Sequence, residues 1–219
     1  MPNPPSTDAL ANLLGALDGC RVCATVQGTP VHGPAVKSRV LLLGQAPGPR
    51  EASFGRPFAW TAGRTLFAWF QGALGCTEET FRERVYIAAV ARCFPGKAKG
   101  GGDRRPNPLE ISSCERWLTQ EVALLKPELV LPVGTLAIER VLGHKGPLAD
   151  VVGRTYLVNF LGARVQAIPL PHPSGASTWH RMEPGRSLLA RALEVLASNS
   201  VLRETLGGAG TPAGENPDR

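Results

Sequence analysis

The chain has 219 residues, of which 43% are hydrophobic and 19% charged, and this length is enough to bury one substantial core. Its 24 Lys and Arg residues against 18 Asp and Glu residues give a net charge of +6, which favours an anionic partner such as nucleic acid. No segment approaches the roughly 20 apolar residues of a membrane span, and the N-terminus lacks the basic-then-apolar order of a secretory signal. We expect a cytoplasmic protein that acts as a monomer and has no membrane partner.

A single domain is expected over residues 8–199, with a tail at each end. Both ends of the chain are rich in Gly, Pro and small polar residues, which bury too little apolar surface to offset the entropy lost on ordering. We therefore predict that residues 1–7 are disordered and that residues 200–219 are largely disordered.

Four short runs rich in leucine and β-branched residues predict buried strands at 39–44, 85–90, 128–133 and 164–170. Apolar residues spaced three to four apart predict helices through 66–74, 109–125, 134–142 and 186–196. This alternation predicts an α/β fold, a three-layer α/β/α sandwich with a central four-stranded parallel sheet. Ligands bind outside the carboxyl ends of the strands in such sheets, so the loops after the strands are the candidate site.

Two of these loops have unusual sequences. The first strand ends in Gly44-Gln45-Ala46-Pro47-Gly48-Pro49-Arg50-Glu51, and Gly55-Arg56-Pro57-Phe58 follows shortly afterwards. Such a loop most often only turns the chain, although glycines also let backbone groups approach a ligand. The last strand is followed by Pro171-His172-Pro173-Ser174-Gly175-Ala176-Ser177. A histidine here is more often structural than catalytic, but two flanking prolines stiffen the turn and would aim its ring.

The cysteines fall into two pairs and one single residue. Cys20 and Cys23 form a Cys-x-x-Cys pair, whereas Cys93 and Cys114 flank a loop rich in Gly, Lys and Arg. In a reducing compartment they are more often metal ligands or core residues than disulfides. The first pair alone fits a zinc half-site, a redox dithiol or half of an iron–sulfur site. Cys76 lies beside an apolar helix end, and we expect it to be a buried apolar residue.

Together, the Gly-x-x-Pro loop and the His-Pro-Ser loop resemble those of the uracil-DNA glycosylase superfamily. The series GQAPGPRE, GRPF and AG is similar to the iron–sulfur branches, families four and five, and the resemblance runs from about Cys20 to about Leu196. It implies a structural [4Fe-4S] cluster held by Cys20, Cys23, Cys93 and Cys114. The interval between the last two is longer here than the usual family pattern, because of the inserted AKGGGDRR.

The resemblance also implies an activity, the hydrolysis of the N-glycosidic bond of uracil, or of a related damaged base, in DNA as the start of base excision repair. A glycosylase must extrude its target nucleotide from the duplex into a pocket. The residues implied at the base are Gln45, Ala46, Phe58, Ala89 and His172. Phe58 would stack on the base, and His172 would donate a hydrogen bond to the O2 anion that develops as the base departs.

Two departures from the family-four pattern affect the expected chemistry. Gln45 occupies the position of an acidic residue, so we expect it to position a water through its carbonyl oxygen, with Glu51 as the electrostatic partner. Ala88 and Ala89 lie where family four commonly has an Asn that reads uracil. A site without such a hydrogen-bonding group rejects other substrates less strongly, so we expect a broader range of bases.

Uracil-containing DNA is thus the expected partner. Its phosphates are expected to contact Ser174, Gly175, Ser177, Arg181, Arg104 and Arg105, with Lys97 and Lys99 adding positive charge. Two alternatives remain open. One is a non-catalytic or covalent uracil-DNA binder of the same fold, although the trapping branch has a histidine in its cysteine loop and this chain has none. The other is a zinc-stabilised nucleic-acid-binding module.

Overall fold

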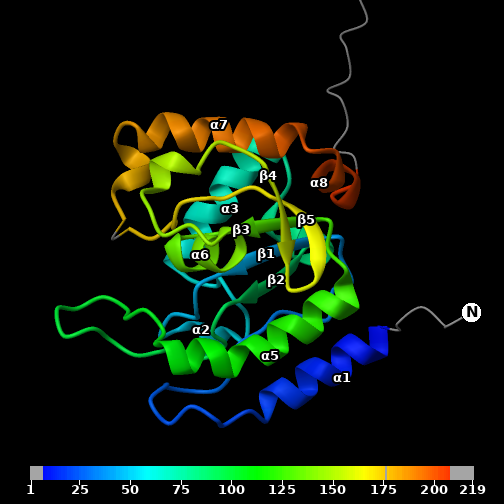
Figure 1. Ribbon diagram of the computed structural model, residues 1–219, viewed down its shortest axis with the longest axis vertical. Helices are drawn as coiled ribbons and strands as arrows, with labels where there is room; N and C mark the ends of the chain where they lie inside the picture. Colours follow the sequence, from blue (N-terminus) through cyan, green and yellow to red (C-terminus); the bar gives the residue numbers. More distant parts are fainter. Residues whose placement is uncertain (1–6, 176, 208–219) are drawn as a thin grey trace, which may run out of the picture.

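A five-stranded sheet forms the centre of the computed structural model, which describes residues 7–175 and 177–207 (Figure 1). The strand order is β2-β1-β3-β5-β4. The strands are β1 (Val40–Gly44), β2 (Tyr86–Ala89), β3 (Leu129–Pro132), β4 (Tyr156–Phe160) and β5 (Ala163–Ala167). The first four strands in this order are parallel, and only β4 runs antiparallel, against β5.

Strands β1 and β3, two of the three inner strands, are buried along their whole length, as continuous apolar runs in a sheet covered on both faces should be. Their side chains alternate between the faces. Val40 and Leu42 belong to one apolar cluster, whereas Leu41 and Leu43 belong to the other. The α/β sandwich expected from the sequence is therefore confirmed, and the four predicted strands correspond to β1, β2, β3 and β5.

The predicted number of strands was wrong, because β4 adds a fifth. It forms a hairpin with β5 through Leu161 and Gly162, whose φ angles are 49° and 87°. Two successive positive φ angles suit a tight hairpin turn, but such turns usually carry Asn or Asp at the first position. Because Leu161 occupies that position, the sequence gives no signal of the turn. The strand also alternates in burial, with Leu157 exposed, so it lacks a continuous apolar run.

Helices cover both faces of the sheet (Figure 1). On one side, α3 (Thr61–Leu74) packs against α7 (Gly185–Ser198), and on the other α1 (Thr7–Asp18) packs against α5 (Pro108–Leu125). The second side also receives α6 (Thr135–Leu142). The shorter elements are α2 (Glu51–Phe54), α4 (Glu78–Arg84), η1 (Leu148–Asp150), η2 (Trp179–Arg181) and α8 (Ser200–Thr205). No helix among the described residues has the length and apolar character needed to cross a membrane.

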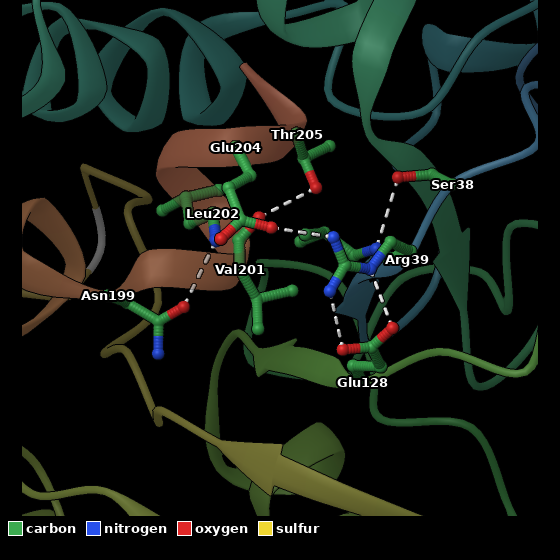
Figure 2. Close-up of polar contacts among 9 residues, drawn as sticks. Ser38, Arg39, Glu128, Asn199, Val201, Leu202, Glu204 and Thr205 are labelled. Carbon is green, nitrogen blue, oxygen red and sulfur yellow. Dashed lines mark hydrogen bonds and ion pairs between the residues drawn. The ribbon is translucent and has the colours of Figure 1, made fainter. Parts of the chain in front are cut away.

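The short helix α8 carries the folded chain beyond residue 199, into the segment that the sequence predicts to be largely disordered. Val201 and Leu202 are buried in the apolar cluster that contains Val40, Leu42 and the buried residues of α3 and α7, here called the α3–α7 cluster. Arg39 binds Glu128 at 2.6 and 2.7 Å and reaches Glu204 of α8 at 2.8 Å. Figure 2 shows these contacts. These ion pairs are half exposed and contribute little, so burial of the two apolar side chains explains the added helix. Residues 1–6 and 208–219, which include most of both predicted tails, lie outside the described residues.

Candidate active site

A cavity of about 610 Å³ opens where the loops after β1, β2 and β5 meet. This edge of the sheet is where the sequence placed the site. The predicted residues that line the cavity are Gln45, Ala46, Glu51, Phe58, Ala89, Arg104, His172, Ser174 and Gly175. Three predicted DNA contacts lie outside the lining, namely Arg105, Ser177 and Arg181. Segments distant in the sequence therefore converge on one concave surface.

Phe58 is held in a conformation that few non-glycine residues adopt, with a φ of 55°. The guanidinium of Arg82 in α4 donates to the carbonyl oxygens of Pro57 and Phe58, each at 2.9 Å. Gly63 of α3 lies against the same backbone, and a Cβ there would come within 1.7 Å of the Phe58 oxygen. A Cβ at Gly44 would come within 2.9 Å of the Phe58 ring. Two glycines and one arginine thus fix this aromatic ring at the cavity.

Glu51, the first residue of α2, is buried and turned toward the backbone of its own loop. Its Oε2 accepts a hydrogen bond from the Gly48 amide at 3.2 Å. Burial raises the pKa of this carboxyl, while the amides of Gly48, Ala59 and Phe58 act in the opposite direction. Glu51 therefore braces the loop that carries Phe58.

His172 is arranged as a neutral hydrogen-bond donor. The Ser174 amide donates to its Nδ1 at 3.2 Å, so the proton of the neutral ring lies on Nε2. Burial lowers the pKa of His172, and the nearby charge of Asp103 only partly opposes this shift. The ring is therefore neutral at pH 7 and offers one N–H group.

From the sequence, no role was assigned to Asp103, because its loop was interpreted as a basic segment. Residues 96–104 fold back as a small hairpin, with Lys97 and Asp103 paired across it and their side chains 2.6 Å apart. The Asp103 carboxylate lines the same cavity as His172 and raises the pKa of that ring. Asp103 is the only acidic residue between Cys93 and Glu110, which was the signal available in the sequence.

The N-terminal cysteine pair lies beside the later one because residues 27–31 run along residues 92–94. The Gln27 amide donates to the Phe94 oxygen at 2.8 Å, and the Val31 amide to the Arg92 oxygen at 2.7 Å. The pKa of Cys93 is raised to about 12, first by burial and then by the charges of the other three thiols, Cys114, Cys20 and Cys23. The four predicted ligands thus share one electrostatic environment. Cys76 is buried in the α3–α7 cluster, as expected.

The surroundings of these thiols suit an anionic metal–thiolate group. Among the described side chains, Nε and Nη1 of Arg92 and Nε1 of Trp117 are buried N–H groups without a partner. Burial raises the pKa of Cys20, but hydrogen bonds from a backbone amide and from Arg116 act in the opposite direction, and the net shift is downward. Burial also raises the pKa of Cys114, and the charge of Arg92 opposes this. Free N–H groups beside thiolates are typical of the shell around a metal–sulfur centre.

A site for a single metal ion would require ligands that lie closer together than those of a cluster. In residues 7–175 and 177–207, no three His, Cys, Asp or Glu side chains are gathered closely enough to hold one metal ion. Thiolates around a four-iron cluster bind different iron atoms and stand farther apart than the ligands of one ion. The four thiols are therefore compatible with a cluster without forming a compact single-ion site.

The sequence profile of the uracil DNA glycosylase superfamily matches residues 30–197. The chain belongs to this superfamily. Among its relatives, the type-4 uracil-DNA glycosylase of Sulfurisphaera tokodaii is 25% identical over 77% of this chain and 76% of the relative. That of Pyrobaculum aerophilum is 31% identical over 64% and 68%, respectively. A type-5 enzyme of Pyrobaculum aerophilum is 31% identical over 51% of this chain and 44% of the relative. The predicted resemblance to the family-four and family-five branches is confirmed.

Two predicted DNA contacts of this superfamily member have partners within the protein. Arg104 binds Glu110 at 2.5 and 2.8 Å and reaches the Thr25 carbonyl oxygen at 3.3 Å. These contacts connect the loop between Cys93 and α5, here called the cysteine loop, to α5 and to the N-terminal segment. The Arg104 guanidinium lowers the pKa of Glu110 to about 2. Arg105 is paired with Glu139 of α6. Both arginines therefore organise the cysteine loop, whatever they contribute to DNA binding.

Proposed function

We propose that this chain is a uracil-DNA glycosylase, which hydrolyses the N-glycosidic bond between uracil and deoxyribose as the first step of base excision repair. The superfamily match and the similarity to relatives named type-4 uracil-DNA glycosylase support the proposal. One observation in the structure carries it. A fixed aromatic ring, Phe58, and a single N–H donor, His172, line the same cavity.

Capture of the base requires a stacking surface that offsets an unstacking cost of a few kcal/mol. Phe58 provides this surface in a conformation held before DNA binds, so little ordering remains for the binding step. Gln45, Ala46 and Ala89 line the rest of the base site. Ser174 and Gly175, which line the cavity, would bind the phosphate beside the extruded nucleotide. We also infer that the protein works on DNA as a cytoplasmic monomer.

Bond cleavage leaves negative charge on the departing base and positive charge on the sugar. The Nε2–H group of His172 donates to the uracil O2 as its charge develops. A neutral donor suits this role, because it need not lose a proton to the leaving base. Burial keeps the ring neutral, and the Ser174 amide selects the tautomer.

On the sugar side we assign the carboxylate role to Asp103 in place of Glu51. The Glu51 carboxylate is engaged by backbone amides, whereas Asp103 keeps one oxygen, Oδ2, outside its hydrogen bond to Lys97. A partly exposed carboxylate at the cavity can stabilise a cationic sugar and accept a proton from the attacking water. Gln45 then positions that water through its side-chain oxygen.

A base-release assay tests the proposed function. Matched oligonucleotides carry uracil, hypoxanthine, thymine or an undamaged base, each as single- and double-stranded DNA. We expect release of uracil and slower release of other deaminated bases, because Ala88 and Ala89 bring no amide that could select uracil alone. Absence of release from every substrate would leave a non-catalytic DNA binder of the same fold.

We further propose that Cys20, Cys23, Cys93 and Cys114 hold a [4Fe-4S] cluster. When bound, the cluster would act as a structural link between the N-terminal segment, the end of β2 and α5, which frame the cavity loops. The buried N–H groups of Arg92 and Trp117 would be available as hydrogen-bond donors to the bound group. Anaerobically purified protein should be brown and contain iron, whereas a colourless zinc protein would favour the zinc-stabilised module.

A further inference from the structure

Two large aromatic side chains are exposed beside the cavity, which is unusual for groups that gain free energy on burial. Phe54 ends α2 and is 48% exposed, and Trp60 precedes α3 and is 39% exposed. Their rings are stacked, with centroids 5.8 Å apart and planes 24° from parallel. Trp60 also lines the cavity, two positions after Phe58 in the chain. The pair therefore extends the aromatic floor of the cavity outward onto the surface.

Two arginines flank this pair. The guanidinium carbon of Arg50 lies 4.6 Å from the centroid of the Trp60 ring, and that of Arg64 lies 5.8 Å away. Neither arginine has an acidic partner among the described residues, in contrast to Arg82 and Arg104, which are paired with carboxylates. Their charges are therefore available to an anion that approaches the aromatic surface.

Exposed rings beside uncompensated guanidinium groups have the chemistry that binds single-stranded nucleic acid, where bases stack and phosphates pair with cations. The DNA strand on either side of an extruded nucleotide must cross the rim of the cavity. We propose that Phe54 and Trp60 form a platform for the nucleobase next to the extruded one, and that Arg50 and Arg64 bind the phosphates of the same strand. This inference rests on the proposed function, because it takes DNA as the ligand of the cavity.

The Trp60 side chain can be replaced while the described contacts of Phe58 are kept. The contacts described above for Phe58 come from Arg82, Glu51, Gly44 and Gly63, and the Trp60 side chain takes no part in them. The backbone oxygen of Trp60 accepts from the Arg64 amide at 3.1 Å at the start of α3, a bond that any residue at position 60 can keep.

The test compares Trp60→Ala, Trp60→Phe and Phe54→Ala with Leu157→Ala, which removes a side chain that is 65% exposed on β4. Binding is measured by fluorescence anisotropy with an unmodified single-stranded oligonucleotide, which needs no cleavage. Loss of one stacked base should weaken binding roughly 5- to 100-fold in Trp60→Ala. Trp60→Phe should retain most of the affinity, and Leu157→Ala should bind as the wild type does.

Salt dependence separates stacking from charge. Trp60→Ala should leave the slope of log affinity against log salt unchanged, whereas Arg64→Gln should reduce it by about 1. Wild-type affinity in both aromatic-to-alanine variants, with normal thermal unfolding, would overturn the inference and point to another occupant for the platform. Lost affinity in Trp60→Ala together with no base release by the wild type would retain the platform and refute the proposed function.

Discussion

Replacing His172 by alanine removes the hydrogen-bond donor that we assign to O2 of the leaving base. Since the Ser174 amide occupies Nδ1, the neutral ring has a single N–H to lose, at Nε2. Deleting one donor to a developing anion lowers the rate by roughly 10²–10³, or about 3–4 kcal/mol. That charge exists only in the transition state, so affinity for uracil-DNA should change little.

The assay is single-turnover release of uracil at saturating enzyme, with affinity measured separately on the same oligonucleotide. His144→Ala is the matched control, because it removes a histidine that lies outside the cavity and contacts the Pro147 oxygen. It should release uracil at the wild-type rate. A wild-type rate in His172→Ala would show that the His-Pro-Ser loop is not the catalytic loop, and the assignment of the site would be wrong.

The pH dependence adds a check on the same residue. Burial lowers the pKa of His172 below 6.5, so the ring is neutral above that value in the folded protein. The single-turnover rate should therefore not fall between pH 6.5 and 8 through loss of a proton from this ring. The unfolded chain takes up the proton first as pH falls below 6.5, so the free energy of unfolding should decrease there, and less so in His172→Ala. A rate that drops as pH rises through 6.5 would indicate a protonated donor instead.

Other substitutions test the remaining parts of the site. Gly63→Ala should lower the free energy of unfolding by about 1–3 kcal/mol and slow uracil release, because the new Cβ would meet the loop backbone at 1.7 Å. Gly72→Ala is the control in the same helix. Its new Cβ would enter open space, so thermal unfolding should show a neutral or stabilising effect. Cys114→Ala should lose bound iron and soluble yield while Cys76→Ala keeps both; full iron content in Cys114→Ala would exclude it as a ligand. Asp103→Asn should slow single-turnover release with little change in DNA affinity, and an unchanged rate would return the carboxylate role to another group.

Local patterns in the sequence were sufficient for much of the fold. Strands β1 and β3 are continuous apolar runs because parallel strands are covered on both faces, so they can be recognised without knowledge of their neighbours. Since parallel strands end at one edge of the sheet, the sequence also predicted that the loops of Gln45 and His172 lie close together, and both line one cavity. Cys76 was recognised as a core residue for a similar reason, since only its apolar neighbours mattered.

Only the tertiary structure decided what individual polar side chains do. Glu51 stands in the motif loop but its carboxylate turns to backbone amides, whereas Asp103, in an inserted loop, lines the cavity with His172 and raises the pKa of that ring. The hairpin at Leu161 was equally hidden, since its turn depends on strand pairing and not on a residue that favours positive φ. The physical reason is common to these cases. The apolar pattern of a buried strand can be recognised from adjacent residues in the sequence. The partner of a charge or an amide comes from a segment that only folding brings near, from a distant part of the sequence.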